Sequence, residues 1–184
     1  MTRNETDDAL MARTARGEEA AFRLLVQRWE AQVRAFLVSM LGSPEEAEDL
    51  AQETFVKIFA QAGRYRGEGL FKSWIFRIAG NLARSRLRRR KILRWVSFDP
   101  AAHDVRDEGP APDGALVAHE RTQAVRAAVA ALPERQRQAL TLHRYQGLKY
   151  REIAAAMDTT VPGVESLIQR ALASLRTDLA GKVD

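Results

Sequence analysis

The chain contains no cysteine among its 184 residues. Disulfide bonds, thiolate metal sites and cysteine nucleophiles are therefore excluded. Histidine is scarce too: His103, His119 and His143 share no spacing typical of metal ligands, so we assign no metal and no cofactor. No apolar run approaches the roughly 20 residues that span a bilayer, and residues 1–10 are polar and acidic, unlike a signal peptide. We expect a cytoplasmic protein without membrane insertion.

The chain is rich in both apolar and charged residues. Hydrophobic residues make up 46% and charged residues 29%, which is enough apolar surface to form a core and enough charge to stay soluble. The 29 lysines and arginines outnumber the 24 acids, for a net charge of +5. A basic chain suits a polyanionic partner such as nucleic acid, although many basic proteins bind none.

Apolar residues recur at helical spacing along most of the chain, and patterns typical of strands are almost absent. The longest such pattern predicts one amphipathic helix, with its apolar face formed by Phe22, Leu25, Val26, Trp29, Val33, Phe36, Leu37 and Met40. A shorter helix is predicted before it, over residues 7–16, with Thr6 as N-cap and Gly17 at its end.

The next helix has a clear start signal. Ser43 is the predicted N-cap, Pro44 the first helical residue, and Glu46 the partner that completes a capping box. Three glycines between residues 63 and 69 predict a loop, and a fourth helix follows over residues 71–94.

The composition changes after this helix. Residues 97–114 hold three of the six prolines and five acids against one arginine, which is typical of an extended, flexible linker. Helical periodicity resumes over residues 116–131. We therefore predict an all-α chain of two small helical domains, 1–96 and 116–184, joined by an acidic linker at 97–115.

The second domain ends in a helix-turn-helix pattern. Helices are predicted from Pro133 to near Gly147, over residues 150–157, and over residues 161–179, with Thr160 capping the last. The inward face of the last helix is predicted to be Val164, Ile168, Ala171, Leu172 and Leu175. Such a motif places its second helix in the DNA major groove. An ordinary helical hairpin in an all-α core is the alternative.

Two stretches of the first domain carry further signals. Asp49, Gln52 and Glu53 share one helix face, which can be a solvated surface, a binding face or part of a metal nuclease. Acids early in a helix are favoured by its dipole, so no catalytic role is needed to explain them. Residues 71–84 interleave aromatics with bases, and seven cations follow within residues 84–94. Cations beside aromatics suit phosphates and unstacked bases. Burial of the apolar residues, and pairing of the cations with acids elsewhere, is the competing explanation.

Three blocks of sequence, at residues 47–55, 71–81 and 132–171, occur in an order that resembles an extracytoplasmic-function (group IV) sigma factor of the sigma-70 family. The resemblance covers roughly residues 10–179. It implies that the first domain is a sigma region 2 bundle and the second a sigma region 4 helix-turn-helix domain. It also implies a non-enzymatic factor that binds core RNA polymerase, directs it to promoters and promotes DNA melting.

The resemblance implies roles for particular residues. Those assigned to the beta-prime clamp of the polymerase are Asp49, Gln52, Glu53 and Phe55. Those assigned to the −10 element are Arg64, Arg66, Trp74, Arg77, Asn81, Arg84 and Arg88. Those assigned to the −35 element are Lys149, Arg151, Thr160, Pro162, Glu165, Ser166, Gln169 and Arg170.

Further partners are implied as well. Region 4 would touch the beta-subunit flap, the linker would thread a cationic RNA channel, and an anti-sigma factor would cover these surfaces. One departure concerns the recognition helix, where many relatives carry a basic residue at the positions of Glu165 and Leu167. Glu165 can accept from cytosine but repels phosphate. The alternative function is a helix-turn-helix regulator that binds duplex DNA without polymerase.

Overall fold

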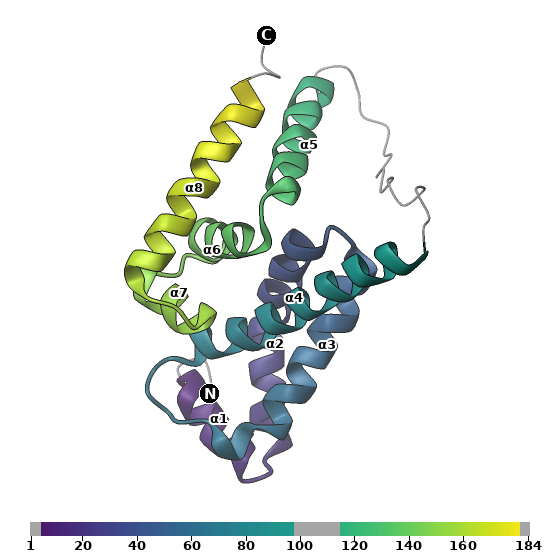
Figure 1. Ribbon diagram of the computed structural model, residues 1–184. Coiled ribbons are helices and arrows are strands. Elements are labelled where there is room, and N and C mark those ends of the chain that lie inside the picture. The colour runs from purple at the N-terminus through teal and green to yellow at the C-terminus, as the bar shows by residue number, and fades with distance from the viewer. Residues whose placement is uncertain (1–4, 98–114, 181–184) are drawn as a thin grey trace.

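The computed structural model describes residues 5–97 and 115–180, and its regular elements in these ranges are all helices (Figure 1). The elements are α1 Asp7–Ala15, α2 Glu19–Leu41, α3 Pro44–Ala60, the 3₁₀ turn η1 Ala62–Arg64, α4 Phe71–Ser97, α5 Ala115–Ala131, α6 Glu134–Arg144, α7 Tyr150–Met157 and α8 Val161–Ala180. The predicted all-α class is confirmed. The predicted acidic linker lies almost wholly outside the described residues.

Helices α1 to α4 form the N-terminal module around the long helix α2, which packs against α1, α3 and α4. The apolar face predicted for α2 is buried at Leu25, Val33, Phe36, Leu37 and Met40. Phe36 meets Phe76 of α4 edge to face, with ring centroids 5.2 Å apart. Such a pair contributes about 1 kcal/mol beyond the area that it buries.

The ends of these helices follow their capping residues. The Thr6 hydroxyl accepts from the backbone N–H of Ala9 at 3.2 Å, and Gly17 adopts the left-handed conformation after α1. The Ser43 hydroxyl accepts from the backbone N–H of Glu46 at 3.3 Å. The capping-box prediction is wrong in its second half, because the Glu46 carboxylate binds arginines of α4.

Helices α5 to α8 form the C-terminal module, which contains the predicted helix-turn-helix. Helix α7 ends at Asp158, a left-handed residue with φ 51°, and the Thr160 hydroxyl accepts from the N–H of Gly163 at 3.2 Å to start α8. Two details differ from prediction. Pro133 precedes α6 as its N-cap, and Leu172 is 48% exposed because it lies on the side of α8 away from its neighbours.

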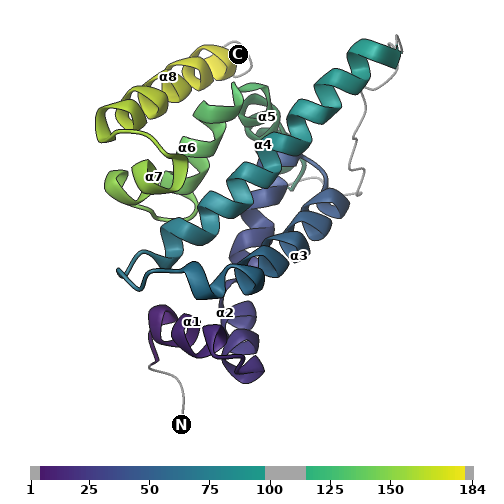
Figure 2. The same ribbon diagram turned by 60° about the horizontal axis from the view of Figure 1, so that its bottom comes forward.

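The two modules pack against each other, with α4 between the N-terminal helices and the helix-turn-helix (Figure 2). Helix α4 contacts α7, and α2 contacts α5 and α6. One cluster of buried side chains includes residues of both modules, among them Phe76, Leu142 and Ile153. The described chain is therefore a single packed body.

Candidate nucleic-acid interface

The acidic face of α3 is open to solvent. Asp49, Gln52 and Glu53 are all exposed, and the Lys57 ammonium lies 3.5 Å from the Glu53 carboxylate in an i,i+4 ion pair. Such an exposed pair is weak, so it leaves the face available. This prediction of a shared, accessible face agrees with the geometry.

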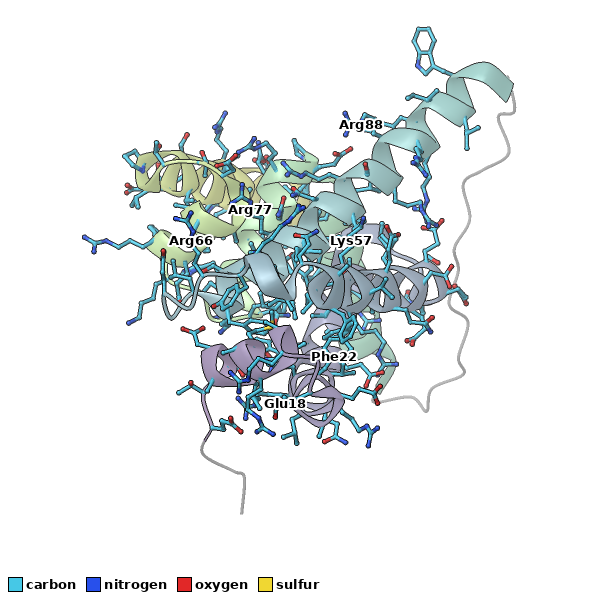
Figure 3. All side chains as sticks on the ribbon, turned by 90° about the horizontal axis from the view of Figure 1, so that it is seen from below. Glu18, Phe22, Lys57, Arg66, Arg77 and Arg88 are labelled. Atoms are coloured by element: carbon cyan, nitrogen blue, oxygen red, sulfur yellow. The ribbon has the colours of Figure 1, made fainter. Side chains whose placement is uncertain are left out.

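The segment before α4 carries two exposed arginines, Arg64 at the end of η1 and Arg66 in the loop that follows. Figure 3 shows Arg66 projecting from this loop. Asp8 of α1 holds this loop, because it accepts from the Tyr65 hydroxyl at 2.5 Å and from the Gly69 N–H at 2.6 Å. Burial and the Asp8 carboxylate raise the pKa of Tyr65 well above its usual range. The Tyr65 ring also lies 4.9 Å from the Trp74 ring. The backbone segment that carries the two arginines is therefore held in one position.

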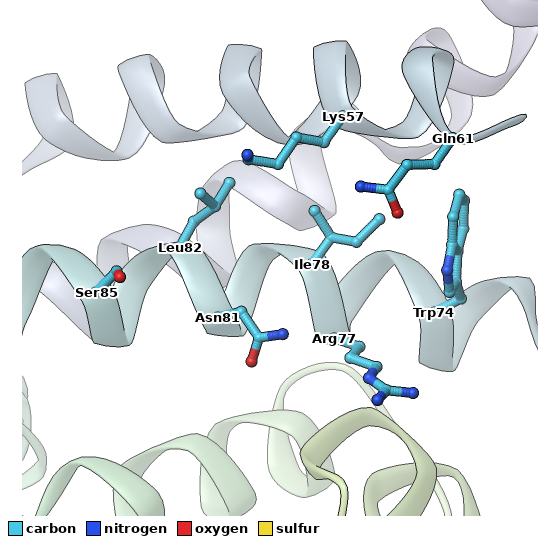
Figure 4. A pocket seen from close by; sticks show the side chains of 8 residues that line it. All are labelled: Lys57, Gln61, Trp74, Arg77, Ile78, Asn81, Leu82 and Ser85. Carbon is cyan, nitrogen blue, oxygen red and sulfur yellow. The ribbon is translucent and has the colours of Figure 1, made fainter.

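A groove of about 460 Å³ runs between α3 and α4 (Figure 4). Its lining residues are Lys57, Gln61, Trp74, Arg77, Ile78, Asn81, Leu82 and Ser85. The indole of Trp74 stands at one end, and Arg77 and Asn81 lie on the side of α4 that faces the C-terminal module. An aromatic ring, amides and cations around an open groove can hold an unstacked base and its phosphates.

The cation run of α4 is only partly available. Arg86 and Arg90 pair with Glu46, and the Lys91 ammonium lies 2.8 Å from Glu134 of α6. Pairing with acids elsewhere thus accounts for these three cations. Arg88 is exposed along the outer part of α4, where phosphates can reach it (Figure 3).

Arg84 occupies a special position in this run. Its guanidinium donates to the Asn81 side-chain oxygen at 2.5 Å. Burial, and then the positive charge of Arg135, lower the pKa of Arg84 from its ordinary value. A cation beside a second cation favours an approaching anion, which would relieve the repulsion between them.

The N-terminal half of α8 presents a polar surface. The residues assigned to −35 contacts are exposed, namely Lys149, Arg151, Thr160, Pro162, Glu165, Ser166, Gln169 and Arg170. The Gln169 amide donates to the Glu165 carboxylate at 3.4 Å. Leu167 is only half-buried and packs against the core, so its side chain is part of the helix packing.

Comparison with known proteins identifies the family. Residues 25–92 match sigma-70 region 2, and residues 122–175 match sigma-70 region 4. The chain is 33% identical to the RNA polymerase sigma-H factor of Pseudomonas aeruginosa, over 93% of this chain and 92% of that protein. It is 36% identical to the ECF RNA polymerase sigma-E factor of Escherichia coli K12, over 93% of each. The chain belongs to the sigma-70 family, in its extracytoplasmic-function group.

Two solved structures resemble this sigma factor. The Bartonella quintana sigma factor RpoE, solved with the anti-sigma factor NepR, superposes with a TM-score of 0.68 at 26% identity and covers 89% of this chain and 98% of that one. CnrH, solved with the cytosolic domain of CnrY, superposes with a TM-score of 0.74 at 24% identity, over 96% of this chain and 99% of that one, and shares the fold.

One predicted docking residue of the sigma factor lies elsewhere. Phe55 is only 7% exposed and belongs to the core, because its position on α3 turns away from the acidic face. Phe55 therefore supports that face from beneath. The same face continues instead through Val56 and Phe59, which are 66% and 48% exposed.

Sequence reasoning missed several other residues of the sigma factor's site. Val56 lies seven positions after Asp49, so helical spacing could have placed it on the docking face. Lys57 and Gln61 line the groove from the α3 side, but only the packing of α3 on α4 brings them opposite Ile78 and Leu82 (Figure 4). The Asp8 anchor of the loop had no local signal, since 57 residues separate Asp8 from Tyr65.

No helix within residues 5–97 and 115–180 is long and apolar enough to cross a membrane. No group of three or more potential metal ligands gathers there either.

Proposed function

We propose that this sigma factor binds core RNA polymerase through the exposed face of α3 and directs it to promoters with −10 and −35 elements. The observation that carries the proposal is the gathering of Asp49, Gln52, Glu53 and Val56 on one accessible strip of α3. Exposed acids followed by an exposed apolar side chain suit a basic, partly apolar helical surface, which is what we propose for the beta-prime clamp. RNA polymerase works in the cytoplasm, where we place this protein.

The groove between α3 and α4 is the proposed site for the −10 element. Trp74 offers a stacking surface at the end of the groove, while Arg77 and Asn81 offer hydrogen-bond donors on its rim. Arg64 and Arg66 on the anchored loop, with Arg84 and Arg88 further along α4, would bind the phosphates on either side. Holding unstacked bases of one strand would shift the duplex toward the melted state.

Helix α8 is the proposed reader of the −35 element. Pro162, Glu165, Ser166 and Gln169 occupy the first turns, which reach base edges in this motif. Glu165 is the residue suited to accept from cytosine N4. Thr160, Lys149, Arg151 and Arg170 flank this surface and would contact phosphates, and the same module would touch the beta flap.

We further propose that an anti-sigma factor controls the protein. The support is the Bartonella quintana relative, which was solved with its anti-sigma factor NepR. A partner that covers the α3 strip or the α4 groove would block core or promoter binding directly.

Reconstituted transcription tests the proposal. Purified protein with core polymerase should give specific initiation on genomic promoter fragments, and transcription equal to that of core alone on every fragment would overturn it. Specific duplex binding by the free protein in a gel shift, without any effect of core, would favour the polymerase-independent regulator.

A paired substitution tests the docking face. Asp49→Ala with Glu53→Ala should weaken core binding at least tenfold without changing the circular dichroism spectrum. The matched control is Glu19→Ala with Glu30→Ala, which removes two exposed acids of α2 on another surface. Equal affinities for the two double variants would contradict the docking role.

A further inference from the structure

Helix α3 borders both the docking face and the −10 groove. Asp49, Glu53 and Val56 belong to the exposed strip proposed for core polymerase, whereas Lys57 and Gln61 line the groove. Glu53, Lys57 and Gln61 follow one another at intervals of four residues, so their side chains form one row along the helix. This row leads from the docking strip to the groove, and Glu53 is the residue that belongs to both.

The Lys57 side chain is held only loosely. Its ammonium lies 3.5 Å from the Glu53 carboxylate, which is longer than the roughly 2.7–2.9 Å of a charge-assisted hydrogen bond. The Lys57 side chain is 42% exposed and that of Glu53 is 46% exposed, so water screens the pair. Figure 4 shows the lysine extended between α3 and α4, near Leu82. The ammonium can therefore exchange Glu53 for another anion at little cost.

The rest of the groove indicates which anion would come close. Ile78 and Leu82 project from α4 toward α3, and Trp74 stands at one end, so the groove offers apolar and aromatic surface to a base (Figure 4). Lys57 is the cation that lines the groove from α3, and Arg77 is the one that lines it from α4. A nucleotide seated between the two helices would carry its phosphates toward these cations.

Lys57 also has a purely structural explanation. It lies in the last turn of α3, where the helix dipole favours a cation, and its i,i+4 pair with Glu53 stabilises the helix slightly. A structural cation of this kind would contribute to stability, but it would leave the affinity for DNA and the salt dependence of that affinity unchanged. Neither effect explains why the lysine side chain lines the groove.

We propose that Lys57 is a further contact for the −10 strand, which binds a phosphate from the α3 side of the groove, and that Glu53 restrains it in the free protein. This inference rests on the proposed function of the groove. A lysine ammonium on its flexible stem suits a phosphate whose position is not fixed in advance. The Glu53 carboxylate acts in opposite directions on the two ligands, because it attracts the core surface and holds back the ammonium that binds DNA.

Substitutions of Lys57 test the contact in the free, full-length protein. Lys57→Gln should weaken binding of labelled oligothymidine roughly fivefold at low salt, and the salt slope should fall by about 0.7, as for one phosphate of a single strand. Lys57→Arg keeps the charge and should restore most of the affinity and the full slope. Arg34→Gln is the matched control, because it removes an exposed cation of α2 that does not line the groove.

Substitution of Glu53 should have the opposite effect on DNA. Glu53→Gln should tighten oligothymidine binding about twofold, because an exposed i,i+4 ion pair accounts for only a factor of this size. The gain should disappear when Lys57→Gln is also present. Glu30→Gln makes the same change at an exposed position of α2 and controls for net charge. Binding of Glu53→Gln to core polymerase should weaken in the same preparations.

Each outcome decides the inference. It is overturned if the unsubstituted protein does not bind oligothymidine at low salt, or if Lys57→Gln changes affinity and salt slope no more than Arg34→Gln does. An equal gain from Glu53→Gln with and without Lys57 would refute the restraint. If Lys57→Gln fails to fold by circular dichroism, the comparison of Glu53→Gln with Glu30→Gln decides.

Core-dependent initiation by the unsubstituted protein is measured in parallel. Initiation without any effect of Lys57→Gln on oligothymidine binding refutes only this inference. A Lys57 effect without core-dependent initiation refutes the proposed function instead.

Discussion

The hydroxyl of Tyr65 donates a hydrogen bond to the carboxylate of Asp8 at 2.5 Å, which ties the first helix to the loop before α4. The other oxygen of the same carboxylate accepts from the backbone N–H of Gly69 at 2.6 Å. One side chain of α1 thus fixes both ends of the segment that carries Arg66, and the order of that segment depends on it.

Replacing Asp8 should loosen the loop. Asp8→Ala leaves the Tyr65 hydroxyl and the Gly69 N–H without their acceptor, at a cost of about 1–3 kcal/mol in unfolding free energy. Affinity for single-stranded −10 DNA should fall, because the loop arginines lose their fixed positions. Urea unfolding and anisotropy measure the two effects. Ala12→Ser, on an exposed position of the same helix, is the control, and an equal loss there would refute the anchoring role.

Alkaline titration should reveal the same contact. The pKa of Tyr65 is raised by burial and by Asp8, so the folded state disfavours tyrosinate. The resulting stabilisation is fully present below the ordinary tyrosine pKa near 10 and is lost as the pH rises toward the higher pKa of Tyr65. Tyr65 should therefore ionise late, as followed by tyrosinate absorbance. The late step should vanish in Tyr65→Phe; its persistence would assign it to another residue.

The N-cap of α3 should matter for stability. Ser43→Ala removes the acceptor for the Glu46 N–H and should lower the unfolding free energy by about 1 kcal/mol. Ser39→Ala is the matched control, because the Ser39 hydroxyl only donates to a carbonyl one turn back in α2. Thermal denaturation of both variants checks the difference. Equal melting temperatures would mean that Ser43 makes no net contribution.

Glu165 and Lys149 should affect promoter binding in different ways. Glu165→Ala should relax the base preference at one −35 position, because a contact to a base edge distinguishes one base pair from another. The difference in binding free energy between the preferred and other base pairs, about 1–3 kcal/mol, should be lost at that position. Lys149→Ala should weaken binding uniformly and reduce the salt slope by about one, since a phosphate contact releases one counterion. Promoter variants titrated at several salt concentrations separate the two. Tighter binding of every promoter by Glu165→Ala would show that Glu165 only repels phosphate.

Local signals predicted the helices well. Ser43, Thr6 and Thr160 each cap the predicted helix, because a cap depends on neighbours within a few residues. Periodicity predicted which side of α2 is buried for the same reason. It failed at Leu172, which the pattern places on the inward face of the last helix but which is exposed, because only the neighbouring helices decide its burial. The surface role of Phe55 came from the family resemblance, and the packing of α3 places that side chain in the core instead.

The sequence alone determined the helical class, the exposed acids of α3 and the order of blocks that resembles a sigma factor, since each depends on local spacing or residue type. Only the tertiary structure decided which cations of α4 are paired, how Asp8 holds the loop, and that Gln138 lies against Gly80. Those relationships join residues 40 or more positions apart, and their geometry depends on how the helices pack rather than on any pattern along the chain.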